Sequence, residues 1–130
     1  RVDSAGRGWI VFHGDGNINF RVRGDTSNQG TMISLPLTAM DKWHHVAVSI
    51  NRNTDEIRLY LDGRMVKASI SHQGQIISAG SESLNIGRHH EDSGHQFVGK
   101  IKDVRIFNRA VGSKSIRAIT GNVDEQVWPH

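Results

Sequence analysis

The stretch WHHVAVSI at residues 43–50 carries the clearest structural signal in the chain. Val46, Val48 and Ile50 occupy alternate positions in it, separated by small or polar residues. Because successive side chains of a strand point to opposite faces, this alternation is typical of a strand with one buried face. Residues 43–50 are therefore predicted to form a β-strand that covers a hydrophobic core.

The residues after this strand extend it into a meander. Residues 51–55 are turn formers, and IRLYL at residues 57–61 repeats the alternation of apolar side chains. Asp62 and Gly63 tolerate the positive φ of a tight turn and lead into a third strand at residues 65–70. Three consecutive antiparallel strands are the expected result.

Upstream, the same signals predict a hairpin and a further strand. WIVF at residues 9–12 indicates a buried strand, and GDGN at residues 14–17 has the composition of a hairpin turn. The return strand covers residues 18–23, and another covers residues 31–35 before Pro36.

Downstream, two more strands and one helix are expected. Residues 83–87 favour a short strand, and residues 97–108 a long one that is bulged or buried on both faces. Ser113 is a suitable helix cap, and Ile116 begins an apolar i, i+3 pair in the helix that follows. Residues 121–130 form a largely polar tail.

Composition excludes several classes of protein. The chain has 130 residues, the size of one domain, and no cysteine, which excludes disulfides and thiolate metal sites. No apolar run approaches the roughly 20 residues of a membrane helix, so membrane insertion is not expected. The net charge of +3 comes from basic residues scattered along the sequence, which argues against nucleic acid but leaves an acidic polysaccharide open as a partner. The expected architecture is an all-β sandwich of antiparallel strands with one short C-terminal helix, in a single domain spanning residues 1–130.

Three motifs give this architecture a family resemblance. They are WHHVAV at 43–48, RLYLDG at 58–63, and LNIG at 84–87 followed by FVGKIKDVRIFNRA at 97–110. Together they resemble the laminin G-like and pentraxin-like domains of the concanavalin A-like lectin/glucanase superfamily. The resemblance implies a concanavalin A-like jelly-roll β-sandwich.

The start of the chain departs from that family pattern. Family members usually carry further sheet strands before the one matching residues 9–12, whereas only residues 1–8 precede it here, and the chain begins with Arg1 rather than Met. We therefore expect a compact variant or a segment of a longer protein, with a sheet edge left open. Such an edge would suit a homo-oligomeric interface.

The most unusual loop is RHHEDSGHQ at residues 88–96. In pentraxin-like relatives this loop carries calcium ligands, so the resemblance implies that Glu91 and Asp92 bind Ca²⁺, with Asp3 the nearest acidic residue before the first strand. Calcium prefers such oxygen ligands, whereas imidazoles suit zinc or copper and leave a transition metal open. A solvated polar loop is the plain alternative.

The same loop suggests sugar binding, because its side chains can donate and accept hydrogen bonds with vicinal hydroxyls. An exposed indole in the tail can stack on a sugar ring or on a neighbouring subunit, or fold back over an edge. Basic pairs on two strands (Arg21 with Arg23, Lys100 with Lys102) would suit acidic glycans, or would simply be a soluble face. The predicted ligand-binding residues are His90, Glu91, Asp92, His95, Asp15, Asn17 and Trp128.

Nothing in the sequence favours an enzyme. A retaining glycosidase needs two carboxylates about 5–5.5 Å apart, and Glu56 has no acidic partner on the same strand face. His44 and His45 are expected to pack, and Asp62 to form a turn. We therefore expect no catalytic residues, and a secreted, lectin-like domain that recognises glycans or glycoproteins. The alternatives are a protein-interaction or adhesion module and an accessory fragment of a larger polysaccharide-degrading enzyme.

Overall fold

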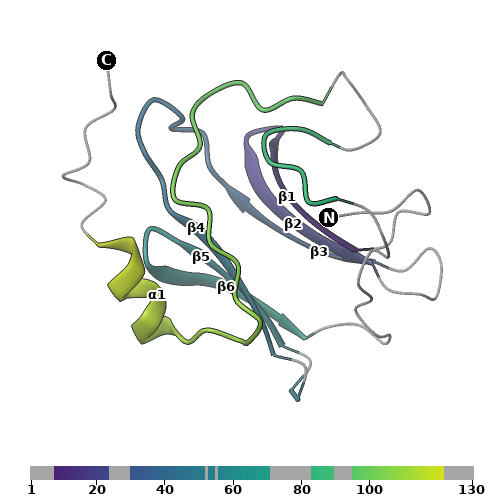
Figure 1. Ribbon diagram of the computed structural model, residues 1–130, viewed down its shortest axis with the longest axis vertical. Coiled ribbons are helices and arrows are strands. Elements are labelled where there is room, and N and C mark those ends of the chain that lie inside the picture. The colour runs from purple at the N-terminus through teal and green to yellow at the C-terminus, as the bar shows by residue number, and fades with distance from the viewer. Residues whose placement is uncertain are drawn as a thin grey trace.

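The computed structural model describes residues 8–23, 30–51, 53–54, 56–70, 83–89 and 95–121. In these residues the chain forms two three-stranded antiparallel sheets and one short helix (Figure 1). An all-β sandwich with one C-terminal helix was predicted, and this prediction is confirmed.

The first sheet has the order β1-β2-β3. Its strands are β1 (Gly8–Gly14), β2 (Asn17–Arg23) and β3 (Gly30–Pro36). Asp15 and Gly16 join the first two strands with φ values of 51° and 73°. This pair of positive φ angles matches the twist of a two-residue hairpin, which is why the turn needs these residue types.

The second sheet has the order β4-β5-β6 and is the predicted meander. Its strands are β4 (Val46–Asn51), β5 (Glu56–Leu61) and β6 (Arg64–Ile70). The turn between the last two strands again uses positive φ, 53° at Asp62 and 82° at Gly63.

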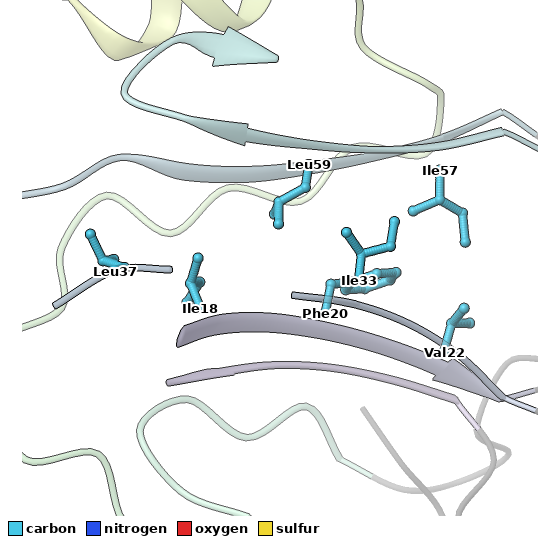
Figure 2. Close-up of a cluster of buried hydrophobic side chains, with 7 residues drawn as sticks. All are labelled: Ile18, Phe20, Val22, Ile33, Leu37, Ile57 and Leu59. Carbon is cyan, nitrogen blue, oxygen red and sulfur yellow. The ribbon is translucent and has the colours of Figure 1, made fainter. Parts of the chain in front are cut away.

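The main hydrophobic core lies between the two sheets, which face each other in Figure 2. Phe20 pairs in register with Ile33 in the first sheet, and both are at most 2% exposed. Ile57 and Leu59 face them from β5 and are fully buried. The complete set of buried residues in this cluster is Ile18, Phe20, Val22, Ile33, Leu37, Ile57 and Leu59.

A second, smaller cluster lies on the opposite face of the second sheet. Tyr60 pairs in register with Ala47, and since neighbouring side chains in a strand alternate, both point away from the main core. The helix α1 (Ser113–Thr120) and Val111 cover them, so Tyr60 is fully buried. In Figure 1 this helix lies on the side of the second sheet that faces away from the first sheet.

The helix starts one residue earlier than a Ser113 cap would require. Gly112 is the N-cap and provides no side-chain hydrogen bond, while the Ser113 hydroxyl lies 3.3 Å from the Tyr60 hydroxyl. Gly121 ends the helix with φ 63° and donates its N–H to the Arg117 carbonyl. The predicted helix is confirmed, but Ser113 serves the contact with β5 and not the cap.

Two predicted strands do not form within the described residues. Residues 83–87 have no regular structure, and residues 97–110 are exposed and paired with no described strand, so burial on both faces was wrong. Gly99, with φ 151°, and Asp103, with φ 54°, interrupt the extended backbone that a strand ladder requires. The predicted strand at 43–50 is confirmed only from Val46 onward.

Among the described residues, no helix is long and apolar enough to cross a membrane.

The core predicts a sharp contrast between two neighbouring positions. Phe20→Ala should lower the free energy of unfolding by about 3–5 kcal/mol, because it leaves a cavity between the sheets. Met32→Ala on the adjacent strand, where the side chain is 57% exposed, should cost no more than about 0.5 kcal/mol. Urea denaturation of both variants measures the difference, and equal losses would contradict this placement of the core.

Candidate functional site

A short hairpin stem carries the loop that the sequence singled out. Phe97 donates its N–H to the Gly87 carbonyl at 2.7 Å, and His89 donates its N–H to the His95 carbonyl at 3.0 Å. Between these bonds, Arg88 and Gln96 form an antiparallel bridge. The two sides of loop 88–96 are therefore held together at its base.

The stem places two imidazoles opposite each other. The rings of His89 and His95 lie edge to face, with centroids 6.2 Å apart and an interplanar angle of 64°. Both rings carry nitrogen atoms that can donate or accept hydrogen bonds, depending on the tautomer. Imidazole nitrogens can form hydrogen bonds with hydroxyl groups or coordinate a transition metal.

Most of the predicted site residues fall outside the described part of the chain. These are His90, Glu91, Asp92, Asp3 and Trp128. Among the described residues, no group of three or more His, Asp or Glu side chains is placed to hold a metal ion. The calcium site therefore stays a prediction from the resemblance.

Asp15 and Asn17 lie at the β1–β2 turn and support its conformation. The Asn17 side-chain amide donates to the Asp15 carbonyl at 2.9 Å, and Gly16 accepts the N–H of Leu37 at 2.8 Å. Asn17 therefore has a structural role in the turn. Ligand binding by Asp15 and Asn17 remains a prediction.

His44 is held at both ring nitrogens. Its Nδ1 lies 2.9 Å from Oδ2 of Asp62, and its Nε2 lies 2.7 Å from the Ala39 carbonyl. A histidine paired with a carboxylate is a common catalytic arrangement, but a general base needs its second nitrogen directed at the substrate. Here that nitrogen faces the backbone, and the imidazole links the loop before β4 to the β5–β6 turn.

His45 joins the start of β4 to the end of the helix. Its backbone N–H donates to Oδ1 of Asp62 at 2.9 Å, and its Nδ1 lies 3.0 Å from Oγ1 of Thr120. Thr120 gives its one hydroxyl hydrogen to the Ile116 carbonyl at 2.7 Å, so the ring must donate through Nδ1–H. Burial lowers the pKa of His45; Asp62 opposes this effect, and the positive charge of Arg105 adds to it.

The contact between His45 and Thr120 could not be found from sequence patterns, since the two residues are 75 positions apart. The same holds for the ammonium of Lys102, which lies 4.6 Å from the centre of the Trp43 ring. The sequence predicted a helix after residue 112, but it did not predict which face of which sheet the helix covers.

With this geometry established, comparison with known proteins decides the family. The family model described as "Concanavalin A-like lectin/glucanases superfamily", Laminin_G_3, matches residues 2–117. The chain belongs to this family. The predicted resemblance and the concanavalin A-like fold class are thereby confirmed, and no curated protein matches the chain.

One similar solved structure shares the fold of this family member. It is the crystal structure of an S-layer domain-containing protein (residues 221–444) from Clostridium thermocellum ATCC 27405, with 23% sequence identity and a TM-score of 0.55. The match covers 92% of this chain and 60% of that chain. At this identity the similarity concerns the fold alone.

The lowered pKa of His45 predicts how stability depends on pH. As pH falls through about 6.5, the unfolded chain takes up a proton at this residue more readily than the folded chain does. The free energy of unfolding should therefore decrease on acidification, and His45→Asn, which keeps a donor for Thr120, should flatten this decrease. Urea denaturation at several pH values between 5 and 8 measures it. Asn53→Ala, an exposed change at a residue that does not titrate, is the control and should keep the wild-type slope. Identical slopes for His45→Asn and the wild type would contradict the assignment.

Proposed function

We propose that this chain is a non-catalytic, lectin-like domain that binds carbohydrate at the loop between His89 and His95. The observation that carries the proposal is the hairpin stem, which aligns two imidazoles at the mouth of a loop rich in polar side chains. Membership of a superfamily whose description names lectins supports it.

Recognition would rest on hydrogen bonds from the loop to sugar hydroxyls. His89 and His95 would act from the stem, and His90, Glu91 and Asp92 from the loop itself, with Asp15, Asn17 and Trp128 as further predicted contacts. Single sites of this kind bind weakly, so oligomerisation of the domain would add avidity. The outer strands of the two sheets, β1 and β3 in one and β4 and β6 in the other, would be the places for such assembly.

A calcium ion remains part of this proposal only through the carboxylates of Glu91 and Asp92, with Asp3 as a more distant candidate. The described donors at the loop base are imidazoles, which suit transition metals better than calcium. If bound, calcium would fix the loop or ligate sugar hydroxyls directly.

The absence of catalysis is also proposed. Both ring nitrogens of His44 face protein acceptors, and the carboxylate of Glu56 is ion-paired with Arg58. The His44–Asp62 pair and the Glu56 carboxylate are the groups that would suit acid–base chemistry, and each is already engaged with other groups of the protein.

An adhesion or protein-interaction module is the second candidate. It is favoured by the fold shared with an S-layer domain-containing protein. Either function places the domain outside the cell. An accessory role within a larger polysaccharide-degrading enzyme would use the same binding loop.

A glycan array probed in millimolar calcium and again in EDTA tests the proposal. We expect binding to a defined glycan class, and the bound glycan should raise the unfolding free energy by about 2.7 kcal/mol at 100 times its Kd. The double variant His89→Ala, His95→Ala should weaken binding by at least about tenfold, since it removes both stem imidazoles.

The control for this experiment is Asn53→Ala, an exposed change in the β4–β5 turn that should leave binding unchanged. Binding that survives EDTA would keep the lectin and remove the calcium. A wild-type protein that binds no glycan in either buffer would overturn the carbohydrate proposal in favour of the adhesion module.

A further inference from the structure

The net positive charge of the chain comes from one segment. Residues 95–121 contain six of the sixteen Lys and Arg residues and a single acidic residue, Asp103. The rest of the chain holds ten basic and twelve acidic residues, so the whole positive excess comes from this segment. The six basic residues are Lys100, Lys102, Arg105, Arg109, Lys114 and Arg117, and all are exposed.

This segment follows β4 across the outer face of the second sheet. The Lys102 ammonium lies over the Trp43 ring, the charge of Arg105 acts on His45, and Val111 donates its N–H to the Ser49 hydroxyl at 3.2 Å. From one contact to the next, the residue numbers increase both in this segment and in the stretch that leads into β4. The segment therefore runs in the same direction as β4, with its basic side chains facing solvent.

The helix places a third cation, Arg117, near the start of β4. Thr120 contacts His45, and a Cβ placed on Gly63 would lie 3.6 Å from Cγ of Arg117. Lys102, Arg105 and Arg117 thus lie around the same corner of the sheet, formed by residues 43–45 and 62–63. We name these three residues the cationic corner.

The segments that form this corner carry more cations than carboxylates. Both carboxylate oxygens of Asp62 already accept hydrogen bonds, from the His44 ring and from the His45 backbone. Asp41 and Asp103 are the other carboxylates on these segments. Against these three carboxylates stand the three cations of the corner and, beside them, Lys42, Arg64 and Lys100.

We propose that the cationic corner binds the sulfate or carboxylate groups of an acidic polysaccharide. The inference rests on the proposed carbohydrate function and adds a ligand class and a second contact surface, separate from the His89–His95 loop. Arg105 and Arg117 each present a planar fork that can hold a sulfate or carboxylate through two parallel hydrogen bonds. Stacking on Trp43 restricts the Lys102 side chain, so less entropy is lost when it binds an anion.

A flexible polysaccharide fits this corner better than a nucleic acid does. Duplex DNA resists bending on the scale of a small domain, whereas a flexible polysaccharide can follow a corner set by three cations. Trp43 is covered by Lys102, so its ring face is not presented for base stacking.

Isothermal titration with a heparin oligosaccharide, and with neutral dextran of the same length, tests the inference. We expect the wild-type protein to bind only the sulfated chain, with an affinity that falls as salt is raised because charges at the surface are screened. Arg105→Gln, Arg117→Gln should weaken this binding by at least about tenfold.

The matched control is Arg109→Gln, Lys114→Gln, which lowers the net charge by the same two units at exposed residues outside the corner. It should stay within about twofold of the wild type, and urea denaturation checks that both double variants are folded. Equal weakening in both would show that overall charge, and not the corner, is responsible and would overturn the inference. So would duplex DNA binding as tightly as the sulfated chain.

The loop variant His89→Ala, His95→Ala separates this inference from the proposed function. If it loses glycan binding while the corner variant keeps full affinity for the sulfated chain, the corner is wrong and the lectin stands. If the wild-type protein binds neither sulfated nor neutral glycans, both proposals fail.

Discussion

The carboxylate of Asp62 holds together the outer side of the second sheet. From the tight β5–β6 turn it accepts hydrogen bonds from the His45 backbone N–H and the His44 ring. The backbone N–H of Asp62 donates to the His45 carbonyl at 2.8 Å. His45 in turn contacts Thr120 at the end of the helix. A short acidic side chain that tolerates positive φ is required here, because the same residue must turn the chain and fix the residues before β4.

The second sheet is consequently buried on two sides by different means. Ile57 and Leu59 pack against the first sheet as part of an apolar core, whereas Tyr60 packs outward under Val111 and Ile116. The outer cluster is small and is bordered by polar contacts, including those of Ser49 and Ser113. Apolar burial thus supplies most of the adhesion between the sheets, while hydrogen bonds position the C-terminal segment.

Sequence patterns predicted the elements whose signal is local. The alternation at Val46, Val48 and Ile50, the turn types at Asp62–Gly63 and the helix before Gly121 all depend on neighbouring residues, and all are present. The prediction of a long strand at 97–108 was wrong. It gave weight to the apolar residues of this segment and not to Gly99 and Asp103, whose positive φ angles interrupt an extended backbone. For the site, the sequence singled out the loop at residues 88–96, and His89 and His95 pair at its base. Contacts such as that of His45 with Thr120 link positions far apart in the chain, so no local pattern predicts them.

The outer layer has a consequence for the order in which the molecule folds. Its contacts join Tyr60 with Ser113, Ser49 with Val111, and His45 with Thr120, across 53, 62 and 75 positions of the chain. The sheets are made mostly of hairpins between neighbouring strands, which close over short loops, whereas this layer must close long ones. On the ribosome the two sheets can pair and face each other while the outer side of Tyr60 is still in water. The contacts that the helix makes with the second sheet can therefore close only after the strands of both sheets have been synthesised, and the cationic corner, which includes Arg117 of the helix, forms with them.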